Sequence, residues 1–398
     1  MRNKLLKVVG SWPAHRDEKE LSAAQEAGFE VAVIAKGKPG DKMRLTEVDS
    51  GLAGMLPVYL CTTRPVSWLP VPVNRVISFF QWARYVRRYK ADVLSCHDII
   101  ALGIGYVSTL FMKKSEAPKL VYDAHEFEIG RNTGGKRGKI ATFFIKHAEA
   151  FLMKRTAFNI MVNDTIADET MRIHRLKVRP LVIRNVPPKW KLDESAIAEQ
   201  RRKFIELVPP PSRSNCLVMY HGAVMYGRGI ENIIQLLTVN PNVTAIVLGN
   251  ALVPEYLDSL VKLAEKLNVR DRVIFHPAAP YRELWKYVGA ADIEFMALDA
   301  SCQSYYYALP NKFFESIQAL VPYVCSDFPE YRKITLKYDI GLLCNSYDIN
   351  QVSEQIEKLR TDKELYQTCR NNMRRAKADL CWENEKMPLV NEYRRLLE

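Results

Sequence analysis

Short apolar runs alternate with helix-period segments along the whole chain, and this alternation constrains the fold more than any other feature. The runs are rich in Val, Ile and Leu, which favour buried strands. They are Leu5–Val9, Val31–Ala35, Val58–Cys61, Val93–Cys96, Leu120–Tyr122, Ile160–Val162 and Leu181–Ile183, then Leu217–Tyr220, Ala245–Leu248, Val273–Phe275, Ile293–Met296, Tyr323–Cys325 and Gly341–Cys344. Segments such as Glu18–Ala27, Lys139–Arg155, Glu255–Leu267 and Asn311–Leu320 lie between them. The spacing predicts parallel sheets covered by helices on both faces.

The alternating pattern runs twice, which predicts two domains. The chain has 398 residues, more than a single hydrophobic core normally serves. Val186-Pro187-Pro188 ends the first series, and Pro209-Pro210-Pro211 follows a charged helical segment. We therefore predict an α/β protein of two doubly wound, Rossmann-like domains, residues 1–188 and 189–380, with a final helical segment at 381–398.

The excess positive charge is confined to the first half. Residues 1–190 contain 31 Lys and Arg against 18 Asp and Glu, whereas residues 191–398 contain 26 against 27. The first half thus has the charge expected for a nucleic acid, anionic membrane or phosphate-bearing partner, unless it is ordinary surface charge. The eight cysteines show no spacing typical of metal or disulfide sites. No signal peptide is recognised, and Ala101–Met112 is shorter than a membrane span, so we expect a cytoplasmic protein.

The segment Leu309–Glu315 is the clearest candidate site, because ligands of doubly wound sheets bind beyond the carboxyl ends of the strands. Pro310 suits a helix start and Asn311 is a suitable cap. A helix that begins here offers its positive end to an anion, and Lys312 adds a full charge. Glu315 lies one turn later, where its carboxylate can accept hydrogen bonds from a ribose diol. The set predicts a nucleotide-diphosphate site; the alternative is a capped surface helix.

Two glycine-rich turns follow strands of the second half. In the first, Gly222 allows close approach of the backbone to a ligand and Arg228 suits phosphate oxygens. Gly249 and Asn250 form the second. Neither turn has the spacing of a Walker loop or a dinucleotide fingerprint. No Asp-x-Asp occurs in the chain, so we expect cations of the protein rather than a metal ion to neutralise the diphosphate.

Three clusters of histidine and acid follow three predicted strands of the first half. They are His15-Arg16-Asp17, His97-Asp98 and Asp123-Ala124-His125-Glu126. Because the carboxyl ends of parallel strands share one edge, we expect these clusters to meet there.

The segment Asn74–Lys90 has two apolar sides. One stripe at helical spacing, predicted to face the core, contains Val76, Phe79, Phe80, Ala83 and Val86. A second set, bordered by basic residues, contains Trp82, Tyr85 and Tyr89. Together with the basic cluster Lys136–Lys139, this set predicts contact with an anionic membrane; ordinary packing is the alternative.

These motifs, taken in order, resemble the retaining glycosyltransferases of family 4, which have the GT-B fold. The resemblance covers almost the whole chain, through Asp17–Glu20, His97-Asp98, Tyr122–Glu126, Arg184–Pro187, Tyr220–Gly222, Arg228-Gly229, Ala291–Ile293, Leu309–Glu315 and Pro322–Asp327. Its most specific element is the Asn-Lys-x-x-Glu sequence that begins at Asn311.

The resemblance implies two domains that face a central cleft, with the acceptor bound by residues 1–188 and the donor by residues 189–380. It implies that segment 381–398 crosses back to the first domain. The donor is then a UDP or GDP sugar, and no further cofactor is needed. The catalytic residues implied are His125, Arg228 and Lys312. The donor-binding residues are Gly222, Arg228, Gly249, Asn250, Asn311, Lys312 and Glu315, and the acceptor-side residues are Asp17, His97, Asp98, Asp123 and Glu126.

The resemblance further implies transfer with retention, without an obvious protein nucleophile. The acceptor is expected to be lipid-linked or a glycan, in polysaccharide or glycolipid synthesis at the inner face of the plasma membrane. Tyr307 and Ala223 depart from the family pattern, where many members have a glutamate and a basic residue. A nucleotide-sugar epimerase of the same fold and a catalytically silent nucleotide-sugar-binding scaffold therefore remain alternatives. Nucleic-acid binding would leave the Asn-Lys-x-x-Glu element unexplained, so no nucleic-acid partner is expected.

Overall fold

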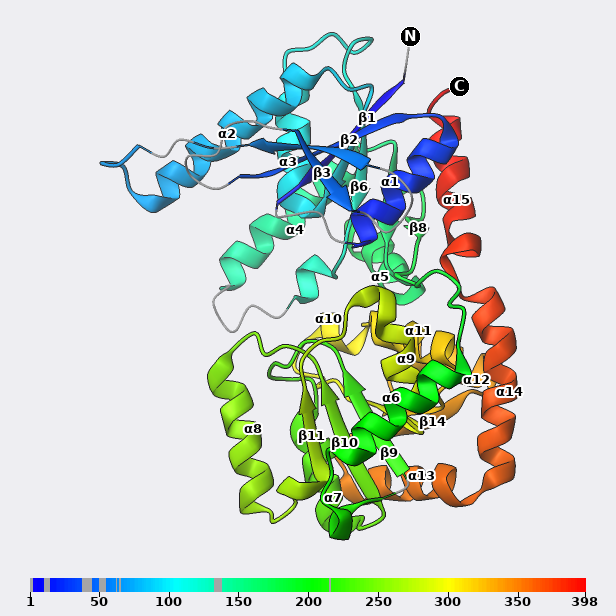
Figure 1. The fold of residues 1–398 in the computed structure, drawn as a ribbon. Helices are drawn as coiled ribbons and strands as arrows, with labels where there is room; N and C mark the ends of the chain where they lie inside the picture. Colours follow the sequence, from blue (N-terminus) through cyan, green and yellow to red (C-terminus); the bar gives the residue numbers. More distant parts are fainter. Residues whose placement is uncertain are drawn as a thin grey trace. The chain divides into compact units, whose positions relative to one another are not determined.

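A computed structural model describes residues 3–10, 15–37, 45–49, 55–61, 63, 66–131, 138–214 and 216–398, with only the backbone at 45–49, 55 and 56. The chain forms two compact units (Figure 1). Unit 1 comprises Met1–Arg184 and Glu385–Glu398, and unit 2 comprises Asn185–Asn384. Both divisions lie four residues from the predicted ones, 188/189 and 380/381. The basic residues Lys136 and Arg137 lie outside the described residues.

Unit 1 is built on an eight-stranded sheet in the order β3-β4-β2-β1-β5-β6-β7-β8. Its strands are β1 (Lys4–Val9), β2 (Glu30–Lys36), β3 (Leu45–Asp49), β4 (Met55–Cys61), β5 (Val93–His97), β6 (Lys119–Asp123), β7 (Phe158–Met161) and β8 (Leu181–Val182). Its helices are α1 (His15–Ala27), α2 (Val71–Tyr89), α3 (Asp98–Thr109), α4 (Lys139–Met153) and α5 (Asp164–His174), with a 3-10 turn at Glu128–Gly130. The strand order reverses between β1 and β5, which is where a doubly wound sheet opens a crevice for ligands.

The edge strand β3 corrects the prediction of a purely parallel sheet. It pairs antiparallel with β4, whereas the other strand pairs of the sheet are parallel. The sequence Leu-Thr-Glu-Val-Asp contains only two apolar residues, so it gave no strand signal. Antiparallel edge strands on otherwise parallel sheets are common.

Helix α2 also differs from the prediction. Its first turn contains Pro72, and it ends at Lys90 in a left-handed conformation. Ala83 and Val86 are buried as predicted, but Val76 and Phe80 are 55% and 56% exposed and do not belong to the core. Trp82, predicted to face a membrane, is instead buried. Periodicity identified an amphipathic helix here, but the covered side includes Trp82 and excludes Val76 and Phe80.

The end of the chain packs within unit 1. Helix α15 (Trp382–Arg395) carries Tyr393, whose ring meets Phe29 and Phe158 edge-on at centroid distances of 6.0 and 5.5 Å. Glu385 accepts hydrogen bonds from the Arg184 guanidinium at 2.6 to 3.2 Å. Residues 385–398 thus complete the unit that begins at the amino terminus.

Unit 2 has a six-stranded parallel sheet in the order β11-β10-β9-β12-β13-β14. Its strands are β9 (Cys216–His221), β10 (Val243–Leu248), β11 (Val273–His276), β12 (Ile293–Met296), β13 (Tyr323–Ser326) and β14 (Gly341–Cys344). Its helices are α6 (Glu194–Glu206), α7 (Ile230–Val239), α8 (Pro254–Lys266), α9 (Leu284–Gly289), α10 (Gln303–Tyr306), α11 (Asn311–Ala319), α12 (Pro329–Tyr338), α13 (Ile349–Thr361) and α14 (Lys363–Asp379), with 3-10 turns at Pro210–Ser212, Arg270–Arg272 and Tyr281–Glu283. The reversal point lies between β9 and β12.

Alternate side chains of the unit 2 strands enter two separate cores. Val218 and Tyr220 of β9 pack with α7, α8 and α13, whereas Leu217 and Met219 pack with α6 and α9. This alternation explains why the strands read as continuous apolar runs, because both faces of the sheet are covered. The prediction of two doubly wound α/β domains is confirmed. None of the helices in the described parts of the chain has the length and apolar character needed to cross a membrane.

Candidate active site

A cavity of about 540 Å³ lies at the carboxyl edge of the unit 2 sheet, beside the reversal point. The turn after β9, the end of β10 and the start of α11 supply most of its walls. The lining residues are Tyr220, His221, Gly222, Ala223, Arg228, Leu248, Gly249, Asn250, Leu252, Ala278, Ala279, Leu284, Pro310, Asn311, Lys312 and Glu315. The residues predicted to bind the donor therefore all line one cavity.

The start of α11 differs in one detail from the prediction. Pro310, rather than Asn311, is the capping residue, and Asn311 is the first helical residue. The Asn311 side chain does not cap the helix; its Oδ1 accepts a hydrogen bond from Nδ2 of Asn185 at 2.7 Å. Pro310, Asn311 and Lys312 all line the cavity, so the positive end of the helix is presented to a ligand there.

Lys312 is a buried lysine whose Nζ has no hydrogen-bond acceptor among the described residues. The residue is 7% exposed. The ammonium lies 3.7 Å from the centroid of the Tyr220 ring. Burial and the neighbouring Arg228 charge lower the pKa of Lys312 to about 7, despite the opposing effect of Glu294 and Glu315. An anion in the cavity would supply the missing acceptor.

His221, at the end of β9, links two carboxylates across the site. Its Nδ1 lies 2.7 Å from Oε1 of Glu294, and its Nε2 lies 2.9 Å from Oε2 of Glu315. Burial alone would lower its pKa, but Glu294 and Glu315 more than offset this and raise the pKa of His221 to about 9. The imidazolium therefore donates to both acids and fixes the position of Glu315.

Sequence reasoning missed His221 and Glu294 as site residues. His221 directly follows an apolar run, the position that identified the other candidates. Glu294 lies inside the buried strand β12, and a carboxylate in such a run needs a partner. These two signals together would have indicated the pair.

The glycine-rich turns are held in place by tight backbone packing. A Cβ at Gly249 would lie 1.8 Å from the carbonyl oxygen of Gly222, and Gly222 has φ of +125°. Asn250 accepts a hydrogen bond from the backbone N–H of Ala278 at 3.0 Å, so it supports the cavity wall. Arg228 lies over the Tyr305 ring with its guanidinium carbon 5.1 Å from the centroid.

In unit 1, four of the predicted residues meet at the carboxyl edge of the sheet. Nδ1 of His97 lies 2.8 Å from Asp17, and Nε2 of His125 lies 2.9 Å from Asp123. The two imidazole rings lie against each other with their centroids 3.5 Å apart and their planes tilted by 32°. Hydrogen bonding to Asp17 raises the pKa of His97 above its usual value, although burial acts in the opposite direction. The expected convergence of these clusters thus occurs within unit 1.

The two acids of this cluster are occupied by the protein cations Lys7, which sequence reasoning missed, and Arg16. Nζ of Lys7 lies 2.7 Å from Asp123 and 3.4 Å from Asp17. Arg16 contacts Asp123 at 3.1 Å and Glu20 at 2.9 Å. Burial would raise the pKa of Asp17, but Lys7 and His97 hold it well below the usual range. Asp17 and Asp123 are fully buried, so in this structure they orient the histidines rather than contact an acceptor.

The donor set Asp17, His97, Asp123 and His125 also has the composition of a metal site, with its candidate ligand atoms within 4.8 Å of one another. A metal ion would compete with the Lys7 ammonium for both carboxylates. The presence of that ammonium makes the set a poor fit to a cation.

Asp98 and Glu126, the other two acids predicted on the acceptor side, have different surroundings. Asp98, the first residue of α3, has φ of +66°, and its Oδ1 accepts a hydrogen bond from the backbone N–H of His125 at 3.3 Å. Non-glycine residues in this conformation are uncommon, and such strain tends to lie at functional sites. Glu126 is half exposed and pairs with Arg131 at 2.9 Å.

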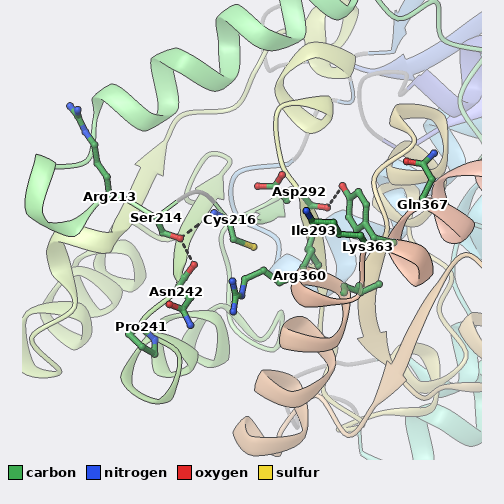
Figure 2. A pocket seen from close by; sticks show the side chains of 12 residues that line it. Arg213, Ser214, Cys216, Pro241, Asn242, Asp292, Ile293, Arg360, Lys363 and Gln367 are labelled. Atoms are coloured by element: carbon green, nitrogen blue, oxygen red, sulfur yellow. Dashed lines mark hydrogen bonds between the residues drawn. The ribbon is translucent and has the colours of Figure 1, made fainter.

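A further cavity, of about 670 Å³, lies at the opposite edge of the unit 2 sheet, around the starts of β9 and β12 (Figure 2). The carboxylate there is already bound: Asp292 accepts from the backbone N–H of Leu217 at 2.7 Å and pairs with Arg201 at 2.9 Å. Ligands of doubly wound sheets bind at the other edge, so we assign this cavity no part in catalysis.

Residues 204–376, within unit 2, match the family model described as Glycosyl transferases group 1. None of the curated proteins compared with the chain matches it in sequence.

Solved structures with the same fold cover nearly the whole chain. HepE of Anabaena, crystallised with UDP and glucose, is 14% identical with a TM-score of 0.74, over 98% of this chain and 99% of that one. Sucrose-phosphate synthase of Thermosynechococcus elongatus is 15% identical with a TM-score of 0.76, over 100% and 99%. The UDP-forming trehalose-phosphate synthase of Burkholderia vietnamiensis is 12% identical with a TM-score of 0.68, over 99% and 100%. The chain thus has the GT-B fold, in agreement with the prediction.

Proposed function

We propose that the chain is a glycosyltransferase that transfers a sugar from a nucleotide-diphosphate donor bound in the unit 2 cavity. The buried Lys312 side chain at the positive end of α11 carries this proposal, because an anion in the cavity would supply the hydrogen-bond partner that its Nζ lacks among the described residues. The glycosyl transferases group 1 domain at residues 204–376 supports it. UDP in the HepE crystals and the UDP-forming reaction in the name of the trehalose-phosphate synthase favour UDP over GDP.

In this proposal Arg228, Lys312 and the start of α11 bind the diphosphate, and Gly222 and Gly249 let the backbone approach it. Glu315 accepts the hydroxyls of the ribose. His221 holds Glu315 in position through a 2.9 Å hydrogen bond. A carboxylate oriented by a charged donor loses little freedom when the ribose binds, which favours affinity.

The chemical step proposed is displacement with retention and without a metal ion. As the bond from the sugar to the diphosphate breaks, negative charge develops on the leaving phosphate, where Arg228, Lys312 and the helix end stabilise it. The acceptor hydroxyl attacks from the same face, and its proton passes to a leaving phosphate oxygen. His125 contacts the transferred sugar, and His97 and Asp98 belong to the acceptor side. Asp17 and Asp123 position the two histidines.

The acceptor proposed is a lipid-linked or glycan molecule at an anionic membrane, in polysaccharide or glycolipid synthesis. Helix α4 supports membrane contact, because Ile140, Phe143, Phe144 and Phe151 lie exposed at helical spacing. Its one acid, Glu149, is buried against Tyr122 and His174, so the exposed charges of the helix are basic. Flotation with anionic vesicles should recover the protein, and Phe143→Asp with Phe144→Asp should abolish recovery. Equal recovery of the Val178→Asp control and the double variant would remove membrane contact from the proposal.

Substitution of Lys312 tests the catalytic proposal. Lys312→Ala should reduce nucleotide release from the preferred UDP or GDP sugar by at least about 100-fold, the scale of losing a stabiliser of developing charge. The exposed Lys266→Ala should retain full turnover. Near-normal turnover of Lys312→Ala would exclude the phosphate role. Conversion of the donor without any acceptor would indicate an epimerase, and binding without turnover would indicate a silent scaffold.

A further inference from the structure

Unit 1 contains a large cavity to which the proposed function assigns no ligand. Its volume is about 1000 Å³, and it lies between α2 and α3. Its walls come from both helices and from the ends of β1, β2 and β5. At one end it reaches His97 and Asp98, the acceptor-side residues of the candidate site. The cavity is therefore continuous with the place where an acceptor hydroxyl would lie.

The cavity walls are mainly apolar and partly open to water. Val76 and Phe80 on α2 and Ile100 on α3 are each more than half exposed, whereas Ile104, which also lines the cavity, is buried. Wet apolar side chains arranged around one cavity gain free energy when a hydrocarbon group covers them. This lining suits a hydrocarbon chain.

Polar groups at the same cavity are suited to an anion. Lys36 and Arg75 line it, and Asp98 is the one carboxylate among the lining residues. Helix α2 carries four arginines and no acid. Trp82 also lines the cavity, and its buried indole N–H has no acceptor among the described residues. Two cations and an unsatisfied donor next to an apolar wall match a phosphate joined to a hydrocarbon chain.

We propose that the cavity between α2 and α3 binds the hydrocarbon chain and phosphate of a lipid-phosphate acceptor, whose reacting hydroxyl lies at His97. This assignment rests on the proposed function for the role of the ligand as acceptor. The binding site itself is independent of the donor cavity, and it takes a single lipid molecule rather than the surface of a bilayer.

Calorimetry with alkyl phosphates below their micelle concentrations tests the assignment without nucleotide. Affinity should rise at least tenfold from hexyl to decyl phosphate, because a buried methylene contributes up to about fourfold. Inorganic phosphate should bind far more weakly than decyl phosphate. Equal affinity for the two alkyl phosphates would overturn the assignment.

Variants locate the binding site. Ile100→Glu should weaken decyl phosphate binding at least tenfold, because it places a charge against the chain. Val178→Glu is the matched control, since Val178 is also exposed in unit 1 but does not line the cavity. Equal effects of these two variants would overturn the assignment. If Ile100→Glu fails to fold, Val76→Glu on the opposite wall replaces it. The same loss of decyl phosphate binding is then expected relative to Val178→Glu.

The donor-site variant Lys312→Ala separates the two proposals. It should bind decyl phosphate normally, and loss of binding would show that the probe occupies the donor cavity and overturn the assignment. If UDP fails to bind the native chain while decyl phosphate binds in the unit 1 cavity, the proposed function fails and the lipid-phosphate site stands.

Discussion

The lowered pKa of Lys312 predicts that nucleotide-diphosphate binding takes up a proton. The free protein has a Lys312 pKa of about 7, against an ordinary value of 10.5. At pH 8 only about one tenth of the free side chain is then protonated. A diphosphate in contact with the ammonium should return the pKa to its ordinary value or above, so binding should take up about 0.9 proton at this pH.

The difference between the Lys312 pKa of the free and the bound protein determines how the affinity for UDP changes with pH. Because the bound state holds more protons than the free state above pH 7, affinity for UDP should fall as the pH rises. With about 0.9 proton taken up, the Kd should rise about eightfold from pH 7.5 to 8.5. The terminal phosphate of UDP is already ionised in this range, since such groups have a pKa near 6. The other charged groups facing Lys312 are Arg228, Glu294 and Glu315, with His221 between the two acids.

Calorimetry in buffers of different ionisation enthalpy measures the proton uptake directly. Lys312→Met removes the titrating group and should abolish most of the uptake and the steep pH dependence. Exposed Lys266→Met should leave both unchanged. A Kd that changes less than about twofold between pH 7.5 and 8.5, or equal uptake by the native chain and Lys312→Met, would refute the reasoning. Uptake that disappears only with His221→Gln would assign the proton to His221 instead.

Two stability predictions follow from the packing around the two sites. Gly249→Ala should destabilise unit 2 by about 3 kcal/mol or more in urea unfolding, because its Cβ would lie 1.8 Å from the carbonyl oxygen of Gly222. Gly138→Ala, where a Cβ meets nothing within 4 Å, should change stability by less than about 1 kcal/mol, and equal losses would contradict the packing argument. Lys7→Met should cost about 3 to 5 kcal/mol, because it leaves Asp123 and Asp17 buried without their ammonium partner. Exposed Lys113→Met should have almost no effect, and a similarly small effect of Lys7→Met would show that Arg16 alone compensates the acids.

The sequence predicted the fold well because the alternation of strands and helices is repeated many times. Helices cover both faces of the unit 2 sheet, so each of its strands is a run of apolar residues. The antiparallel strand Leu45–Asp49 was not predicted, because an edge strand needs few apolar residues. On α2, periodicity showed that the helix is amphipathic, but the side that becomes covered depends on α3 and the cavity between them.

The candidate site could be predicted in part for a related reason. Lys312, Arg228, His97 and His125 follow strands or begin helices, and topology brings such positions to one edge of each sheet. Lys7 and Glu294 lie inside strands, where sequence reasoning expects only core residues. Their function depends on partners far away in sequence, such as Asp123 for Lys7 and His221 for Glu294. Only three-dimensional structure supplies such partners.

The packing of Tyr393 against Phe29 and Phe158 has a consequence for synthesis on the ribosome. The amino-terminal unit emerges first, yet its hydrophobic core and the ion pair between Arg184 and Glu385 are complete only after residues 385–398 have been translated. The second unit is a contiguous segment, so the whole of it is translated before the first unit can complete its packing.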